Sequence, residues 1–352
     1  MCNILPLSKR TTTNGHNIMN KIGTVCMTGH YDQQKQKFIQ AKDTMIGTVT
    51  QKSMLQLCGV PSITELTDQH ITDNYNKLSV KLTAKVKQNL NALYNQLCFI
   101  ADMPTQCHLF RISSNLLPLF DHPNFSVLYD DTLLKLVDVL LARCKRTIGK
   151  HDITVCTHPD QFVVVNSESE SVRLKAYNTL YCHKYFMERL TSSDTSSINI
   201  HLNGNLDHLP ELDQGLYSDL IPWLSLENED KNGKLFTGSV ENTLQVCEKY
   251  GIKMLLDLHH HYALTGDQID INNSIVDRII ATWNGYTPIM HLSQGRDEPT
   301  DRKHSDMITD PDLIYYATDW LHITHLELEA KHKTTCVDQF YLDVQKCEAD
   351  HN

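Results

Sequence analysis

Residues 224–228 read Leu-Ser-Leu-Glu-Asn, a short apolar run with β character that ends in the carboxylate of Glu227. Six further segments carry a metal-type ligand, and most of these ligands also lie at or just after the end of a short apolar run. In chain order the other segments are VCTHP (155–159) with His158, INIHL (198–202) with His201, LLDLHHH (255–261) with Asp257 and His260, PIMHLS (288–293) with His291, KHSD (303–306) with His304, and LELEAK (326–331) with Glu329. One fold places the carboxyl ends of many parallel strands around a single pocket, and a pocket filled with His, Asp and Glu binds metal ions.

β-like and helix-like stretches alternate along most of the chain. Strands are expected at 21–26, 108–113, 152–157, 197–202, 224–227, 252–258, 288–292 and 323–327, and helices at 85–102, 131–148, 170–190, 211–223, 238–250, 273–283 and 311–320. About eight β/α units predict an α/β protein with one closed (β/α)₈ barrel, a TIM barrel. We expect this domain to span 21–346, with tails at 1–20 and 347–352 and a polar N-terminal insertion at 30–78 that packs over one end of the barrel.

Composition narrows the classes of function. The formal charge of −10 counts against DNA binding, because sequence-independent nucleic-acid binders are usually basic. That count includes carboxylates that bound cations would neutralise, and a local basic surface can exist on an acidic protein. The sequence has no apolar run long enough for a membrane span and no signal-peptide core, and its eleven cysteines form no CxxC pair. We therefore expect an intracellular protein in a reducing compartment, with no membrane partner. No GxGxxG or P-loop pattern is present, so no nucleotide cofactor is expected.

The ligand-type residues follow successive strands of the expected barrel and should converge on one face. Charged groups gathered there would repel one another unless they bind cations. A mixture of imidazole and carboxylate suits Zn²⁺ or Mn²⁺ better than Ca²⁺. The set is too large for one tetrahedral ion, so two or three divalent ions are expected. Such clusters activate a water and hold the attacking and leaving oxygens in phosphodiester hydrolysis.

The same segments, taken in order, resemble the UV damage endonucleases. The resemblance runs from about residue 85 to residue 333, with a shorter match around Gly23, and is carried by FRISSNLLPLFDHP (110–123), THPDQF (157–162), IHLNG (200–204), SLEN (225–228), LDLHH (256–260), PIMHLS (288–293), HSDMI (304–308) and LEAK (328–331). It implies a barrel like that of endonuclease IV and the xylose isomerases, with Mn²⁺ as the first choice of metal and Zn²⁺ or Mg²⁺ as alternatives. It also implies a monomer that cleaves duplex DNA on the 5′ side of UV photolesions, namely pyrimidine dimers and 6-4 photoproducts.

The resemblance also implies roles for individual residues. Glu227, Asp257, His291 and Glu329 would bind one ion, His158, His201 and Glu227 a second, and His260 and His304 a third. The catalytic residues would be Glu227, Glu329 and His122, with His122 near the scissile phosphate. Gln161 and Phe162 would form a wedge in the duplex, where an amide can fill a base-pair gap and an aromatic ring can stack on exposed bases. Arg111 and Lys331 would contact phosphates, with a structural ion pair as the alternative role for each.

A position on the expected seventh strand departs from the family pattern. Ile289 stands where the family commonly has a lysine, two residues before the histidine of the seventh strand, and its side chain cannot bind a metal. The third ion is thus left with two matched protein ligands. Three alternatives remain open: an abasic-site endonuclease of the endonuclease IV type, a sugar isomerase or epimerase on the same barrel, and a non-catalytic binding protein.

Overall fold

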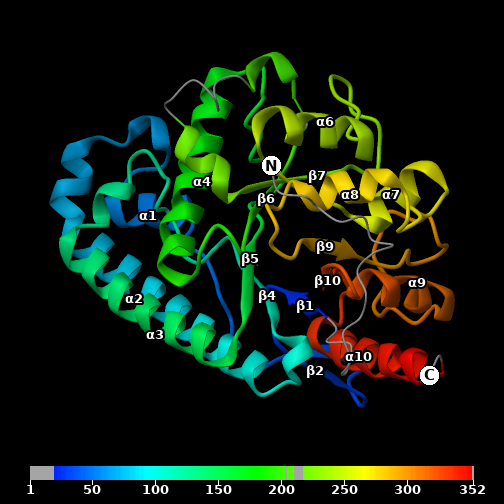
Figure 1. Ribbon diagram of the computed structural model, residues 1–352. Helices are drawn as coiled ribbons and strands as arrows, with labels where there is room; N and C mark the ends of the chain where they lie inside the picture. The colour runs from blue at the N-terminus through cyan, green and yellow to red at the C-terminus, as the bar shows by residue number, and fades with distance from the viewer. Residues whose placement is uncertain (1–19, 203, 210–216, 351–352) are drawn as a thin grey trace.

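A computed structural model of the chain describes residues 20–202, 204–209 and 217–350 (Figure 1). At its centre, eight parallel strands form a barrel. They are β1 Ile22–Val25, β4 Leu109–Ile112, β5 Thr154–Thr157, β6 Ile198–His201, β7 Leu224–Glu227, β8 Lys253–Leu255, β9 Ile289–Leu292 and β10 His325–Leu328. Their order is β8-β7-β6-β5-β4-β1-β10-β9. A parallel bridge between Asp257 and His291 joins the two ends, with the His291 N–H 3.1 Å from the Leu256 carbonyl oxygen. The predicted (β/α)₈ barrel is confirmed.

Helices surround the barrel, and local sequence signals set their ends. The long helices are α2 Asp68–Ala101, α3 Asp131–His151, α4 Glu170–Leu190, α6 Val240–Tyr250, α9 Pro311–Leu321 and α10 Lys333–Asp350, with the shorter α8 Ser274–Ala281 before β9. Helix α6 is typical: the Ser239 side chain accepts a hydrogen bond from the Asn242 N–H, and Gly251 closes the helix at φ 67°. Between β6 and β7 the described residues contain the 3₁₀ turns η5 Leu206–His208 and η6 Ser218–Trp223, and the rest of the helix expected at 211–223 lies outside the described residues.

The segment after β1 differs from the expected insertion. It holds the hairpin of β2 Gly29–Asp32 and β3 Lys37–Gln40, then α1 Gln51–Cys58 and the turn η2 Ile63–Glu65. From Asp68 onward the chain already belongs to α2, which begins with a capping box at Thr67 and buries Ile71, Leu78 and Leu82 on one face. The extra elements thus end about ten residues before the expected boundary at 78, because polar residues between these apolar positions hide the helical spacing. At the other end of the chain, α10 extends through residues 347–350, where a tail was expected.

The two ends of the barrel interior differ in chemistry. Leu109, Cys156, Leu255, Trp283 and Ile289 form a separate buried apolar cluster. On β4 and β9 this apolar layer lies two residues before a polar one, so that Arg111 follows Leu109 and His291 follows Ile289 on the same face. The apolar cluster therefore closes the amino-terminal part of the barrel, and the polar side chains gather at its carboxyl end. Every cysteine in the described part of the chain is a free thiol, and within that part no helix is both long and apolar enough to cross a membrane.

Stability should depend on pH through a buried histidine. His183 of α4 is 1% exposed, and its Nδ1 lies 2.9 Å from the Thr157 hydroxyl. Burial, aided by nearby His158, lowers the pKa of His183 to about 3. The unfolded chain binds this proton below about pH 6.5 while the folded protein does not, so the free energy of unfolding should fall as the pH drops below that value. At pH 5 the loss from this group is about 2 kcal/mol.

Denaturant unfolding at pH 7 and pH 5 checks this. A His183→Gln variant should be less stable than the wild type at pH 7 but should show a smaller loss between the two pH values. Equal losses in the two proteins would contradict the assignment.

Candidate metal centre

The predicted ligands converge at the carboxyl ends of the barrel strands. His158 follows β5, His201 ends β6 and Glu227 ends β7. Asp257 caps the short helix α7 Leu258–Thr265, which carries His260 in its first turn. His291 lies on β9, and Glu329 follows β10. Glu227 is 2% exposed and lies at the centre of this set.

Four imidazoles surround the Glu227 carboxylate. Its Oε2 lies 3.3 Å from His158 Nε2 and 3.6 Å from His201 Nε2. Its Oε1 lies 3.4 Å from His260 Nδ1 and 3.1 Å from His291 Nδ1. Asn199 also donates a hydrogen bond to Oε2. A single carboxylate therefore faces two pairs of rings, one with each oxygen.

Three groups of side chains in the described residues have ligand atoms within 4.8 Å of one another. They are His158, His201 and Glu227; Glu227, Asp257 and His260; and Asp257, His291 and Glu329. The first group has the same members as the ligand set expected for the second ion. The third group, Asp257, His291 and Glu329, contains three of the four ligands expected for the first ion. The fourth, Glu227, contacts this group through His291. His260 falls with Glu227 and Asp257, whereas His304 lies beside Glu329, with 3.6 Å between its Nδ1 and Glu329 Oε2. The pair expected to hold the third ion does not share a group.

In three of the rings the Nδ1 atom contacts a nearby oxygen, and in His158 and His201 this is the nitrogen that does not face Glu227. His158 Nδ1 lies 2.9 Å from the Pro159 carbonyl oxygen, and His260 Nδ1 lies 2.9 Å from that of Asn228. His201 Nδ1 lies 3.1 Å from Glu229 Oε1. A proton on Nδ1 lets His158 and His260 donate to these carbonyl oxygens and leaves the Nε2 lone pair of each neutral ring free. Outer-sphere contacts of this kind fix the tautomer of metal-binding histidines.

Neighbouring charges shift the pKa values of residues in the cluster. Burial disfavours the carboxylate form of Glu227, but His291, His201 and the hydrogen bond from His158 outweigh burial and hold the pKa of Glu227 well below its usual range. Burial also opposes a charge on His260, yet Asp257 and Glu227 raise the pKa of His260 to about 9. Asp257 Oδ2 is buried without a hydrogen-bond partner among the described residues. An unpaired buried carboxylate oxygen beside histidine nitrogens is a position that a divalent cation would satisfy, so these residues fit a metal centre.

Several residues that support the cluster were not singled out from the sequence. Asn199 contacts Glu227, Asn228 contacts His260, Glu229 contacts His201, and Glu327 of β10 lies fully buried inside the barrel. The alternation in residues 325–329 carried a signal for one of them. Side chains two residues apart face the same side of a strand, so Glu327 shares the inward face with Glu329.

Arg111 and Lys331 occupy different environments. Arg111 of β4 is 8% exposed and pairs with Glu327 and, at 2.6 Å, with Glu329. Two carboxylates inside the barrel engage its guanidinium, which corresponds to the structural ion pair given above as the alternative role. Lys331 is half-exposed and lies 3.1 Å from Asp306 Oδ1.

His122, Gln161 and Phe162 belong to loops beside the barrel mouth. His122 Nδ1 accepts hydrogen bonds from the N–H groups of Asn124 and Phe125, so its proton is on Nε2, which lies 3.0 Å from Gln51 Oε1. His122 and Phe162 line the same groove of about 600 Å³, to which α1 contributes Gln51. Phe162 is 78% exposed, and its neighbour Gln161 is exposed as well.

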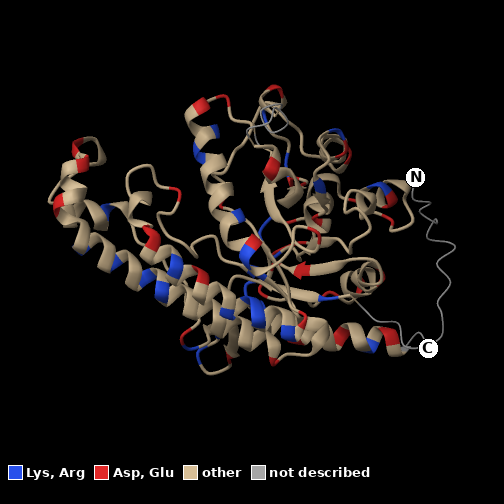
Figure 2. Ribbon diagram, turned by 60° about the vertical axis from the view of Figure 1, so that its left-hand side comes forward, with Lys and Arg blue, Asp and Glu red and all other residues tan. Residues whose placement is uncertain are grey.

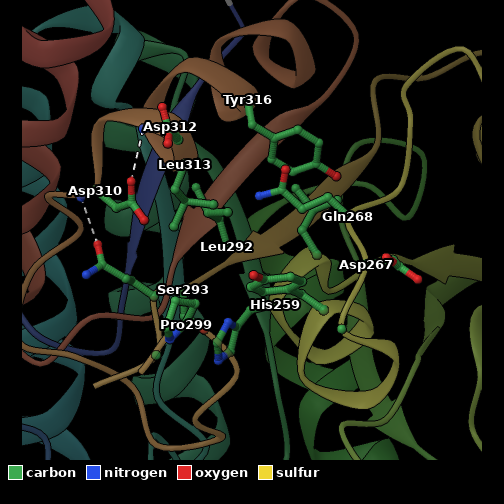
Figure 3. A pocket seen from close by; sticks show the side chains of 15 residues that line it. His259, Asp267, Gln268, Leu292, Ser293, Pro299, Asp310, Asp312, Leu313 and Tyr316 are labelled. Atoms are coloured by element: carbon green, nitrogen blue, oxygen red, sulfur yellow. Dashed lines mark hydrogen bonds between the residues drawn. The ribbon is translucent and has the colours of Figure 1, made fainter. Parts of the chain in front are cut away.

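A second pocket lies on the other side of the cluster. It encloses about 460 Å³ between α7, the end of β9 and α9, and Figure 3 shows Leu292, Leu313, Tyr316 and His259 around it. His259 Nε2 lies 2.9 Å from the Asp301 carbonyl oxygen, so this ring belongs to the pocket wall. His259 directly precedes His260 in the sequence, and Leu292 directly follows His291. The pocket therefore lies next to the candidate ligands.

Positive charge is concentrated away from the cluster. Figure 2 marks lysine and arginine positions in blue along the ribbons of α2 and α3, the two long helices that run side by side. On α3 these residues include the exposed Lys135, Arg143 and Arg146. A local basic surface is thus present on a chain whose formal charge is −10.

Comparison with curated proteins finds UV DNA damage endonucleases. The protein of Bacillus velezensis is 30% identical over 216 residues, which make up 57% of this chain and 62% of that protein. The protein of Bacillus pumilus is 29% identical over 252 residues, which make up 66% of this chain and 73% of that protein. The match to the Bacillus velezensis protein thus spans less than two thirds of its length.

Solved structures share the fold. The crystal structure of SacUVDE matches with a TM-score of 0.66 at 22% identity, over 92% of this chain and 97% of that chain. Endonuclease IV from Thermus thermophilus matches with a TM-score of 0.53 at 15% identity, over 73% of this chain and 94% of that chain.

The comparison with family models confirms the resemblance seen in the sequence. The model described as UV-endonuclease UvdE matches residues 20–349, which include every barrel strand and every candidate ligand. The chain belongs to the UV-endonuclease UvdE family.

Proposed function

We propose that the protein is a metal-dependent DNA repair endonuclease. It would hydrolyse the phosphodiester on the 5′ side of UV photolesions, pyrimidine dimers and 6-4 photoproducts, in duplex DNA. The observation that carries the proposal is the position of Glu227, a buried carboxylate with four histidines around it at the mouth of the barrel. The names of the curated relatives, UV DNA damage endonuclease, supply the substrate class.

Two or three divalent ions would be held by the three groups that share Glu227 and Asp257, with Mn²⁺ as the first choice and Zn²⁺ or Mg²⁺ as alternatives. When bound, such ions supply Lewis-acid stabilisation of the phosphate and an activated water. His304, beside Glu329, would join this set at the rim of the barrel.

The chain's own residues would position the substrate. Glu227 would hold the four histidine rings around it in place, and Glu329 would hold His304. His122, whose Nε2 carries a proton, would donate a hydrogen bond to a phosphate oxygen once DNA displaces the Gln51 contact. Lys331 would add a point charge near the same rim, and its pair with exposed Asp306 costs little to break.

Phe162 and Gln161 would recognise the lesion. An exposed phenyl ring is unfavourable in water without a partner, and an unstacked base provides one. The amide of Gln161 can take hydrogen bonds that the displaced base leaves open. The protein would act as a monomer on damaged double-stranded DNA.

The first test is nicking of irradiated plasmid. With Mn²⁺, irradiated supercoiled DNA should be nicked and non-irradiated DNA should stay intact. A duplex with a single abasic site, tested in parallel, separates this activity from that of an abasic-site endonuclease. Glu227→Gln should lower nicking more than about 100-fold, because replacing a shared ligand costs more than replacing an outer-sphere partner. The matched control is Glu248→Gln, which alters an exposed glutamate paired with Arg278 and should nick like the wild type. Wild-type protein that leaves irradiated DNA intact with every metal would refute the proposal.

The second test addresses the exposed ring. Phe162→Ala should lower kcat/KM on a single-lesion duplex about 5- to 150-fold, the range that follows from losing about 1–3 kcal/mol of stacking. Its Tm should stay at the wild-type value, because the ring is exposed in the free protein. Val139→Ala, which removes an exposed apolar side chain on α3, serves as the control. Equal losses in the two variants would mean that Phe162 does not contact the lesion.

The third test concerns protons. In the metal-free protein His260 has a pKa of about 9, so at pH 7 its ring carries a proton that a bound cation must displace. The apparent affinity for Mn²⁺ should therefore rise about tenfold per pH unit between pH 7 and pH 9 through this group alone. Calorimetry in two buffers of different ionisation enthalpy measures the protons released, and His260→Gln should release about one fewer. Binding without proton release would show that His260 is not a ligand.

A further inference from the structure

Glu327 is a buried carboxylate with no assigned role. It lies on β10 inside the barrel, two residues before Glu329, and its side chain is completely buried. Its Oε2 accepts a hydrogen bond from the Cys156 thiol at 2.8 Å. Its Oε1 lies 3.2 Å from His291 Nε2 and is paired with the Arg111 guanidinium. Glu327 is not a member of any of the three ligand groups in the described residues.

The setting of Glu327 argues against a purely structural role. The buried Arg111–Glu327 pair lies next to the apolar layer that contains Leu109, Cys156 and Ile289. Removing two charges from water is costly, and a well-packed apolar residue is often as stable at such a place. The charged pair at this level of the barrel is better explained by what it contacts than by the stability it adds.

Its decisive contact is with His291. The Nδ1 atom of this ring faces the ligand cluster, at 3.1 Å from Glu227 Oε1 and 3.8 Å from both Asp257 Oδ2 and Glu329 Oε1. A cation in this group needs the Nδ1 lone pair, so the ring proton must be on Nε2. Of the two groups that lie next to Nε2, Arg111 at 2.7 Å can only donate, and Glu327 can accept.

Arg111 gives Glu327 a second connection to the cluster. The guanidinium pairs with Glu327 and also lies 2.6 Å from Glu329 Oε1. Without Glu327, the full positive charge of Arg111 would be left to Glu329 and to His291 Nε2. The stronger pairing of Arg111 with Glu329 and its unbalanced charge beside His291 would each weaken cation binding among Asp257, His291 and Glu329.

We propose that Glu327 is a positioning residue for one metal site. It accepts the Nε2 proton of His291, so that Nδ1 is presented to the cation, and it neutralises Arg111, so that Glu329 stays available as a ligand. This inference rests on the proposed metal-dependent function and concerns the group of Asp257, His291 and Glu329, while the group of His158, His201 and Glu227 is independent of it.

The test is a titration of metal-free protein with Mn²⁺, in which the electron paramagnetic resonance signal of the free ion measures how much Mn²⁺ remains unbound. Glu327→Gln keeps the shape of the side chain and an acceptor oxygen but removes the charge. The dissociation constant of one site should rise about 10- to 100-fold, the range found for outer-sphere partners of metal-binding histidines. A site held by His158 and His201 should keep its affinity. On irradiated DNA, kcat should fall while KM stays unchanged.

The control is Cys156→Ser, which alters the other contact of Glu327 but keeps a donor to Oε2. It should bind Mn²⁺ like the wild type. If Glu327→Gln binds all its ions with wild-type affinity, or weakens every site alike, Glu327 is not a positioning residue for His291. If the wild type binds no divalent ion, the proposed function itself is wrong, so the two failures are distinguishable.

A measurement on the wild type covers the case in which Glu327→Gln does not fold. Protein labelled with ¹⁵N at histidine and loaded with Zn²⁺ should show His291 with its proton on Nε2 and the metal on Nδ1. Loss of metal-induced shifts at Nδ1, or a proton on Nδ1 in the loaded protein, would overturn the inference.

Discussion

The structure depends on the enclosure of one carboxylate, Glu227, by four histidine rings at the carboxyl end of a parallel barrel. A buried charge of this kind is tolerated only when it is paired, and each oxygen of Glu227 faces two imidazole nitrogens. In the metal-free protein, protons on His201, His260 and His291 supply the opposite charge, because nearby carboxylates outweigh burial and raise the pKa of each of these rings. A divalent cation can take the place of those protons, because contacts at Nδ1 orient the rings of His158, His201 and His260. The same arrangement therefore suits both states of the site.

The barrel divides into an apolar part and a reactive part. The layer around Leu109, Trp283 and Ile289 fills the amino-terminal half of the interior, and the ligands occupy the other end. Two buried charged residues, Arg111 and Glu327, contact His291, and Arg111 also contacts Glu329. Loops outside the barrel add the exposed ring of Phe162 and the groove that it shares with His122. The cluster is thus held by strands, whereas the groups suited to contact a long substrate lie on loops, which can adjust to it.

Much of this could be predicted from the sequence. The barrel follows from short apolar runs alternating with helical spacing, and the ligands were found because each one ends such a run, as Glu227 does in LSLEN. The helices α1, α7 and α10 were not predicted, since α7 is a single short segment after Asp257 and α10 was taken partly for a tail. Tertiary pairing was harder still. Arg111 was expected to contact a phosphate or to form a structural ion pair, and only the folded barrel brings it beside Glu327 and Glu329, across β1 from its own strand. Likewise, His260 and His304 are both ligand-type residues, but His260 lies with Glu227 and Asp257 whereas His304 lies beside Glu329.

The most direct measurement is anomalous diffraction at the manganese edge from crystals grown with Mn²⁺. The account predicts one peak between Glu227 and the pair His158–His201, and another among Asp257, His291 and Glu329, with the two sites joined through Glu227 and Asp257. A Glu227 carboxylate that remains bonded only to protonated histidines, with no peak beside it at saturating Mn²⁺, would contradict the account.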